Sequence, residues 1–486
     1  MEKEFILNQY FFKITYACII FICVYVPKAS SGELETFIAD LKLHYQNSSS
    51  ISAFSLTHRY LGRSNPYQSW DYKTPSRYQA FKVTDIDLTK KHYAQNVVHN
   101  FTGNLYFDEV HFQNDSESLR YERNGISIGK RVIKQSLNSF ERYKNLTLMN
   151  VDFFAVRPLL EENLITKNIS FFKDPLSSKV TLTHQVAGDI LVEYEFNTSP
   201  LRLLSINNKL KRRIYNFDDY QTTNGLTFAR SLVKYYNGDS IPSIITRIEK
   251  FEILEKVEPT KLVLPKGYGP VIPKADKHLT SQQIASDIYL VTDSSASRNT
   301  LFKVNDEDIM VFGAPVSTKL SEQTIKLILE PFPNKKITSV FVTHPHSDHI
   351  AGLPAFVKHG VTVYADFYTI EAIKAYDRFA DNIDQYKFKT IEHEDLIDGV
   401  RFHILESSQA KRQSFAYFED DGIIYQSDFL EVAFDNTIAK ILPSYSKAFI
   451  DFVRNKKIKI NRIVGHHRNN NISMEVVNKS YQANTM

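Results

Sequence analysis

The sequence is poor in cysteine, since its 486 residues include only Cys18 and Cys23. Both lie inside one apolar run near the N-terminus, so the chain beyond that run contains no cysteine. This absence excludes a disulfide framework, a thiolate nucleophile and cysteine metal ligands from the body of the protein. Any catalytic or metal chemistry in the body must therefore use other side chains.

A strong excess of one charge is also absent, because the formal net charge is only +4. The basic clusters at Lys209–Arg213 and Arg454–Lys459 are short and typical of solvated surfaces, so we expect no nucleic-acid partner. Hydrophobic residues make up 43% of the chain and charged residues 23%, which is a globular rather than a disordered composition. The length predicts two or three domains.

Long hydrophobic runs are missing except near the N-terminus. Ile14–Val26 is uncharged, follows Lys3 and Lys13, and is ended by Pro27 and small residues. This layout predicts a signal peptide over residues 1–31 and an exported protein, periplasmic or secreted. The run is short for a bilayer span, but an uncleaved membrane anchor through residues 14–26 stays open. We expect no other integral membrane span.

Residues 32–262 are rich in Tyr, Phe, Thr and Val between turn signals and predict one antiparallel β-rich domain. The clearest signal is a hairpin of Leu226–Tyr236 and Ile244–Leu254, joined at Asn237-Gly238. Helices are predicted over Ser31–Tyr45 and Phe154–Glu162. Further strands are predicted around Gly103–Phe107, Lys179–Thr183 and Ile190–Phe196. The stretches "TTNGLTFARSLVKYYNGD" and "LVLPKGYG" weakly resemble the half-barrels of lipoprotein-carrier-like proteins. Both a ligand-holding concavity and a plain packing domain are compatible with this pattern.

Three prolines between residues 264 and 277 predict a linker, after which residues 263–486 change character. Strands come first in succession and then alternate with helices, which predicts a layered α/β body. The predicted strands are Ile288–Thr292, Thr300–Val304, Asp308–Phe312, Ile337–Val342, Val361–Tyr364, Arg401–Leu405, Ser414–Phe418, Gly422–Gln426 and Asn461–Val464. The predicted helices are Leu320–Leu329, Gly352–Val357, Thr369–Phe379 and Ser446–Asn455.

Three histidines and an aspartate fall within six positions of the stretch "VFVTHPHSDHIAGL". His344 and His346 are two residues apart after a predicted strand, so their side chains leave on the same side. Asp348 and His349 follow at the expected start of a helix. Imidazole nitrogen and carboxylate oxygen are suitable ligands for zinc and similar divalent ions. The stretch therefore predicts a metal site.

The spacing His-x-His-x-Asp-His resembles the signature of the metallo-β-lactamase superfamily. The resemblance implies an αββα sandwich of the metallo-β-lactamase type over the C-terminal half, with one or two Zn²⁺ ions. It also implies further ligands in "GIIYQSDFLE" and "INRIVGHHRN", which fall on Asp428 and His466, with His467 as the second choice. By resemblance His344, His346 and Asp428 would bind one metal. Asp348, His349, Asp428 and His466 would bind the other.

Two family positions are occupied by other residues. Gln409 stands where the superfamily has another histidine ligand, and His403 on the preceding strand is poorly placed to replace it. Gly313 stands where the superfamily has an aspartate that supports the ligands. The first metal site is therefore expected to be weakened, with one occupied site or an unequal pair as open outcomes.

The resemblance implies a metal-dependent hydrolase that acts on an ester, thioester, lactam or similar electrophile of a small-molecule substrate. Asp348 would be the catalytic residue that orients the attacking water. The missing family residues leave open a degenerate, non-catalytic binding protein, and some relatives load iron for redox chemistry instead. No Gly-x-Ser-x-Gly elbow, phosphate-binding glycine loop or Cys-x-x-Cys pair competes. The sequence gives no oligomeric state.

Overall fold

The computed structural model describes residues 31–161, 164, 168–187, 190–274 and 278–484. The predicted signal peptide lies outside the described residues apart from Ser31. Within the described part of the chain, no helix has both the length and the apolar composition needed to cross a membrane. The chain forms two compact units, one from residues up to Tyr45 with Pro158–Arg212, the other from Gln46–Arg157 with Arg213–Met486.

The smaller unit combines one helix with a meander of antiparallel strands. Helix α1 spans Ser31–His44, as the sequence predicted, and its Phe37 ring lies 5.7 Å from Phe171 and 5.5 Å from Phe196. These contacts bury one side of the helix against the strands. The strands are β7 (Ile169–Lys173), β8 (Lys179–Ala187), β9 (Ile190–Thr198) and β10 (Leu201–Asn208), each paired with the next.

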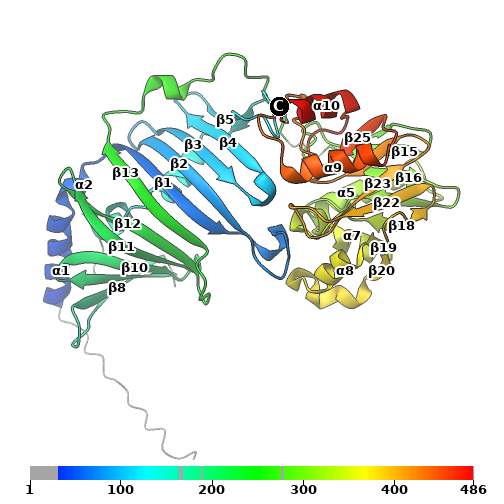
Figure 1. The fold of residues 1–486 in the computed structure, drawn as a ribbon. Coiled ribbons are helices and arrows are strands. Elements are labelled where there is room, and N and C mark those ends of the chain that lie inside the picture. Colours follow the sequence, from blue (N-terminus) through cyan, green and yellow to red (C-terminus); the bar gives the residue numbers. More distant parts are fainter. Residues whose placement is uncertain (1–30, 162–163, 165–167, 188–189, 275–277, 485–486) are drawn as a thin grey trace, which may run out of the picture. The chain divides into compact units, whose positions relative to one another are not determined.

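The larger unit contains a long run of paired antiparallel strands, which confirms the predicted β-rich N-terminal region (Figure 1). Its strand order is β6-β5-β4-β3-β2-β1-β13-β12-β11. The predicted hairpin forms from β12 and β13, and Asn224 and Gly225 make the turn before β12 with positive φ angles of 52° and 76°. The strands are β1 (Ala53–Arg63), β2 (Arg77–Asp87), β3 (His92–Asn100), β4 (Tyr106–Gln113), β5 (Ser118–Glu122), β6 (Ile133–Gln135), β11 (Arg213–Thr223), β12 (Leu226–Tyr236) and β13 (Ile244–Ile253).

Two local predictions in this region are only partly correct. The strand expected around Gly103–Phe107 begins at Tyr106 as β4, and the residues before it form the short helix η2 (Thr102–Asn104), because Gly103 takes a φ of 76° that a strand does not allow. The helix expected from Phe154 is only one turn, α4 (Asp152–Ala155), followed by η3 (Arg157–Leu159). Pro158 lacks the backbone N–H that a longer helix would need.

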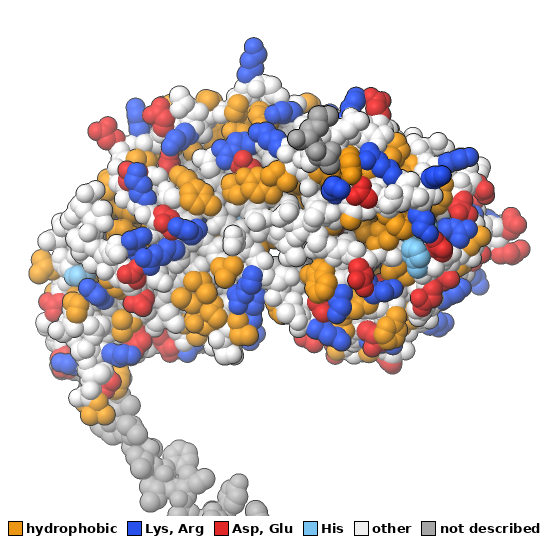
Figure 2. All heavy atoms as spheres, in the orientation of Figure 1, with side chains coloured by type: hydrophobic (Ala, Val, Ile, Leu, Met, Phe, Trp, Pro, Cys, Tyr) orange, Lys and Arg blue, Asp and Glu red, His pale blue; other side chains and the backbone are white. Residues whose placement is uncertain are grey.

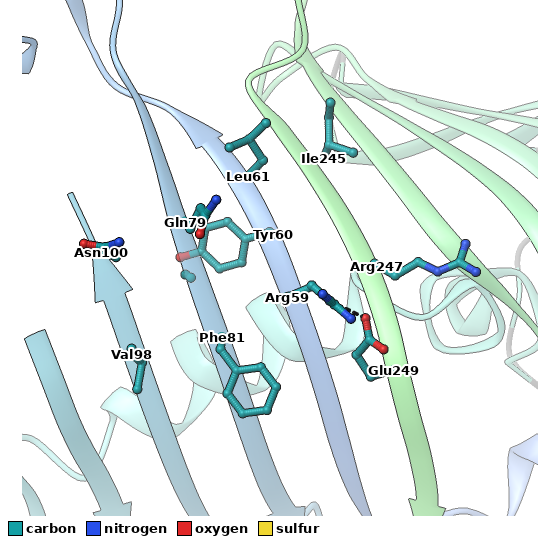
Figure 3. A pocket seen from close by; sticks show the side chains of 11 residues that line it. Arg59, Tyr60, Leu61, Gln79, Phe81, Val98, Asn100, Ile245, Arg247 and Glu249 are labelled. Carbon is teal, nitrogen blue, oxygen red and sulfur yellow. Dashed lines mark hydrogen bonds and ion pairs between the residues drawn. The ribbon is translucent and has the colours of Figure 1, made fainter. Parts of the chain in front are cut away.

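The two faces of this sheet differ in character. Helix α4 covers the inner face, where the Phe154 ring lies 4.6 Å from Phe54 and the Phe153 ring 5.4 Å from Phe251. On the open face, exposed side chains such as Leu61 and Phe81 border a hollow of about 820 Å³ (Figure 3). Alternation of side chains along each strand produces this separation.

The C-terminal half contains two further sheets. A seven-stranded sheet has the order β14-β15-β16-β17-β18-β19-β20, and a five-stranded sheet has the order β21-β22-β23-β24-β25. The strands of the first are β14 (Thr280–Gln283), β15 (Ile288–Thr292), β16 (Thr300–Val304), β17 (Asp308–Phe312), β18 (Lys336–Phe341), β19 (Thr362–Ala365) and β20 (Lys387–Thr390). Those of the second are β21 (Leu396–Ile397), β22 (Val400–Leu405), β23 (Gln413–Phe418), β24 (Ile423–Gln426) and β25 (Arg462–Gly465).

Helices cover the outer face of each sheet, and three apolar cores hold the layers together. Phe312 and Phe341 of the first sheet meet Phe402 and Phe418 of the second in the central core. The outer cores join the first sheet to α5 (Thr318–Leu329), α7 (Leu353–Lys358) and α8 (Phe367–Lys374), and the second sheet to α9 (Ser444–Asn455) and α10 (Met474–Ala483). The layers confirm the predicted αββα sandwich. Helix α10 was not predicted.

Candidate metal centre

Three chain segments leave the two sheets of the sandwich at one edge and carry the predicted ligands there. His344 and His346 follow β18, and the one-turn helix α6 (Ser347–Ile350) carries Asp348 and His349. Strands β24 and β25 are parallel and pair Gln426 with Gly465. Asp428 and His466 therefore emerge side by side beyond the ends of these two strands.

Each histidine that follows β18 has one ring nitrogen engaged by a neighbour and the other directed toward Asp428. The Nδ1 of His344 lies 3.0 Å from the hydroxyl of Thr343, and the Nε2 of His346 lies 3.1 Å from the carbonyl oxygen of Ser69. The Nδ1 of His349 lies 3.1 Å from the hydroxyl of Ser427. Such contacts fix the orientation and tautomer of metal-ligating histidines.

Asp428 occupies the centre of the site in a strained backbone conformation. Its φ is 59°, in the left-handed region that non-glycine residues rarely adopt. Its Oδ2 lies 3.5 Å from the Nε2 of His344 and 3.2 Å from the Nε2 of His349. Because this carboxylate faces histidines of both predicted metal sites, it can bridge two cations.

A group that contains Asp348, His349 and Asp428 of the predicted second set, with His467 in place of the predicted His466, has distances near those of a tetrahedral metal site. The Nε2 of His467 lies 3.1 Å from Asp428 Oδ1, 3.5 Å from Asp348 Oδ2 and 3.3 Å from the Nε2 of His349. The Nε2 of His349 lies 3.6 Å from Asp348 Oδ2 and 3.2 Å from Asp428 Oδ2. Ligands about 2.0–2.2 Å from a tetrahedral zinc ion lie roughly 3.3–3.6 Å from one another. These four residues therefore fit one cation.

His466 also reaches this set. Its ligand-type nitrogen lies within 4.8 Å of those of His349 and His467. Among the described residues, its Nε2 has no hydrogen-bond partner although the side chain is fully buried. A buried unpartnered nitrogen is costly, and a cation would satisfy it. His467, the second choice from the sequence, thus stands beside His466 rather than replacing it.

The first set is less complete. His344, His346 and Asp428 present ligand atoms within 4.8 Å of one another. The side chain of Gln409 fills the remaining space, with its Nε2 3.0 Å from Asp428 Oδ2 and 3.1 Å from the Nδ1 of His346. An amide oxygen is a weaker ligand for zinc than an imidazole nitrogen. His403 lies elsewhere, with its ring against Phe415.

Tyr425 takes over the supporting role expected at the position of Gly313. The Tyr425 hydroxyl lies 2.8 Å from the Nδ1 of His466. A side chain at Gly313 would collide with that hydroxyl, and Gly313 has a φ of 101° that favours glycine. The missing aspartate and the buried tyrosine are therefore one exchange, which still holds His466 by its Nδ1.

The ionisation of the site suits cation binding. Burial lowers the pKa of His344 to about 3, so its imidazole is neutral at pH 7. Burial opposes the ionised form of Asp348, but the neighbouring His349 and His467 outweigh it and lower the pKa of the carboxyl. His349 is the exception, because burial opposes its protonation but Asp348 and Asp428 raise its pKa, so a cation must displace a proton from this imidazole. Neutral imidazoles and ionised carboxylates are the ligand forms that metals require.

Three contributors were not found in the sequence. Gln68 donates to Asp348 Oδ1 at 2.9 Å, and Arg298 contacts Asp348 Oδ2 at 3.1 Å. The third is the Ser69 carbonyl that orients His346. Gln68 and Ser69 lie in the loop after β1, about 280 residues from the motif they contact, so no local pattern identifies them.

Two β-sheets between helices, with histidines and aspartates gathered at one edge, define a candidate metal-binding protein of the αββα class. Residues 312–404 match the family model of the Metallo-beta-lactamase superfamily. This match supports the resemblance to that superfamily that the signature predicted for the C-terminal half. The match includes His344–His349 but ends before Asp428, so the roles of the later ligands rest on geometry.

Several solved structures of metallo-β-lactamases are similar to this chain at low sequence identity. A metallo-β-lactamase from Erythrobacter litoralis is 14% identical, with a TM-score of 0.34 over 42% of this chain and 95% of that chain. One from Hirschia baltica is 13% identical, with a TM-score of 0.33 over 42% and 97%. One from Pontibacter korlensis is 15% identical, with a TM-score of 0.34 over 42% and 98%. The curated proteins contain no match. The superfamily assignment rests on the family model and the layered architecture. The lipoprotein-carrier resemblance stays a prediction.

Proposed function

We propose that this protein is an exported zinc-dependent hydrolase that acts on an ester, thioester, lactam or similar electrophile of a small-molecule substrate. The observation that supports it is the distance of 3.1–3.6 Å that the Nε2 atoms of His349 and His467 keep from each other and from carboxylate oxygens of Asp348 and Asp428. Only nitrogen and oxygen ligands are present, which suits zinc. When bound, zinc lowers the pKa of a water molecule to about 7 and so supplies a nucleophile at neutral pH.

The chain's own residues position and orient the reactants. Gln68 and Arg298 hold the Asp348 carboxylate from two sides, at 2.9 and 3.1 Å. A carboxylate fixed in this way can orient an attacking water molecule toward an electrophilic carbonyl. Asp348 is therefore the catalytic residue of the proposal.

The test combines metal analysis with a panel of lactam, ester, thioester and phosphoester substrates. We expect about one to two zinc ions per chain, turnover that a chelator abolishes and zinc restores, and no turnover by Asp348→Asn. His359→Ala is the matched control, because His359 is an exposed histidine ten residues beyond the motif. Full activity of the metal-free protein would contradict the proposal.

The position of Gln409 supports a second candidate, a non-catalytic binding protein with a decayed hydrolase fold. Metal binding without turnover of any panel member would favour it. The remaining alternative is an iron centre. An optical spectrum distinguishes it from a zinc centre, because iron sites absorb visible light and zinc is colourless.

Export and domain division belong to the same proposal. The run Ile14–Val26 supports export to the periplasm or outside the cell, with an anchor as the result if the signal stays uncleaved. Residues 32–262 would then help to place the substrate for the hydrolase domain of residues 263–486. The N-terminal sequence of the protein recovered from its source tests the cleavage after residue 31.

A further inference from the structure

A pocket of about 250 Å³ opens directly onto the candidate metal centre, and the N-terminal sheet supplies one of its walls. Its floor includes His346 and Asp348, while Phe101, Leu105 and Phe107 line it from the chain around η2. Trp70, from the loop after β1, completes this wall. All of these residues belong to the larger compact unit.

The aromatic side chains of the wall are held in place. The indole Nε1 of Trp70 donates to the carbonyl oxygen of Ser407 at 2.7 Å. The ring of Phe101 is stacked on Tyr78, with centroids 5.0 Å apart, and lies edge-on to Phe107 at 6.0 Å. A preformed apolar surface loses little conformational entropy when a ligand binds to it. Yet Trp70 is 41% exposed, so part of this surface remains available to a ligand.

The apolar wall of the pocket is uncharged. The two carboxylates that line the pocket, Asp348 and Asp428, belong to the candidate metal centre, and the lining includes neither lysine nor arginine. Lys411 lies 5.8 Å from the Trp70 ring, but it is paired with Asp71 at 3.0 Å. An anionic group therefore finds no cationic partner on this wall, whereas an uncharged apolar group finds three apolar side chains and an indole.

We propose that the wall formed by Trp70, Phe101, Leu105 and Phe107 binds an uncharged alkyl or aryl acyl group of the substrate hydrolysed at the metal centre. This rests on the proposed function for the reaction, but the binding of an apolar group does not depend on turnover. The pocket volume is at the lower end of small-ligand sites, which indicates a short chain or a single ring rather than a large apolar molecule.

The kinetic test uses thioesters of N-acetylcysteamine with acetyl, butanoyl, hexanoyl, octanoyl and phenylacetyl groups. Burial of each methylene group contributes up to about 0.8 kcal/mol, or roughly fourfold in kcat/KM. We expect kcat/KM to rise from acetyl to octanoyl and the octanoyl-to-acetyl ratio to fall at least about tenfold in Phe107→Ala. Phe107→Leu should restore part of the ratio, because leucine is also apolar.

Phe81→Ala is the matched control. Phe81 pairs with Val98 on β3, and Phe107 pairs with the adjacent His99, so the two phenylalanines point to opposite faces of the same sheet. Phe81 is also 45% exposed and borders the separate hollow of Figure 3. We expect the octanoyl-to-acetyl ratio of kcat/KM of Phe81→Ala to equal that of the wild type. Thermal unfolding of all variants distinguishes lost binding from lost folding.

A second measurement needs no turnover, because Trp70 is the single tryptophan of the chain. Titration with 2-octanone, which is uncharged and cannot be hydrolysed, should shift Trp70 emission to shorter wavelength in a saturable manner. Phe107→Ala should weaken this binding at least about tenfold, and Phe81→Ala should not change it.

The two measurements separate the two proposals. A saturable Trp70 shift without turnover of any thioester or of any other substrate of the panel contradicts the hydrolase and supports the apolar site. Turnover that is independent of chain length, with no Trp70 shift, overturns the apolar site and leaves the hydrolase. If no thioester reacts, the fluorescence titration alone decides the apolar site.

Discussion

Replacing His467 by alanine removes one nitrogen from the set of ligand atoms that best fits a single cation. The His467 Nε2 lies 3.1–3.5 Å from atoms of Asp428, His349 and Asp348, and its ring is mostly buried. His466 and His467 are adjacent in sequence, but their ring centroids are 5.0 Å apart and nearly perpendicular. One cannot simply replace the other.

The magnitude follows from the share of one ligand in the binding of zinc. Four-ligand structural sites bind zinc with about 10–16 kcal/mol at pH 7, so one ligand contributes on the order of 3 kcal/mol. At about 1.4 kcal/mol per factor of ten, His467→Ala should weaken zinc binding roughly 100-fold. Because burial lowers the pKa of His467, the wild-type imidazole is available as a neutral ligand at pH 7.

The assay is a competition titration of zinc against a chromophoric chelator, with metal content measured after dialysis. His466→Ala gives the comparison within the site, and His359→Ala gives the control outside it. We expect both site variants to lose affinity and the control to match the wild type. Unchanged zinc affinity in a folded His467→Ala protein would refute the assignment of His467 as a ligand.

Three further predictions follow from the same structure. Tyr425→Phe removes the hydroxyl that holds His466 and should weaken zinc binding about 10–100-fold. Tyr417→Phe is the control and should leave zinc binding unchanged, because the Tyr417 hydroxyl binds a backbone carbonyl on the other face of β23 and β24. Equal effects of the two variants in calorimetric titrations would contradict this role of Tyr425. Gln409→His supplies a third imidazole to the first set and should raise the metal content toward two per chain by elemental analysis; an unchanged content argues against a weakened first site. Burial raises the pKa of Asp152 from 3.8 to about 7, so the folded state retains a proton that the unfolded state releases. The associated stability is fully present below pH 3.8 and is lost as the pH rises toward 7, by on the order of 4 kcal/mol. Asp152→Asn should flatten this decline in urea unfolding at pH 4.5 and 7.5, and parallel pH profiles of the two proteins would count against it.

The αββα fold of the C-terminal half could be predicted from the sequence because its strands are buried on both faces. Strand β23 illustrates this, since Phe415 and Tyr417 contact the layer of α9 while Ala416 and Phe418 fill the core between the sheets. Such strands are short apolar runs bounded by turns. Local signals failed where one residue overrode the pattern, as at Gly103 with its positive φ and at Pro158 after α4.

The candidate site likewise contains residues that the sequence identifies and residues that only the structure reveals. His344, His346, Asp348 and His349 are recognisable because ligands that share one strand end keep a fixed spacing. The exchange of support from Gly313 to Tyr425 is invisible in sequence, because these residues are more than 100 positions apart and meet only when the two sheets are stacked. His466 and His467 both reach the candidate metal centre because their side chains take particular directions, and the sequence of the dipeptide does not determine these directions.

By itself, the sequence determined the apolar periodicity of the layers, the identity of the donor atoms and the lack of cysteine beyond the N-terminal apolar run, since these are properties of residues and of their local spacing. Only the tertiary structure decided which atoms share one cation and which apolar side chains face it. Those relations depend on long-range contacts such as that of Gln68 with Asp348, which no local pattern encodes.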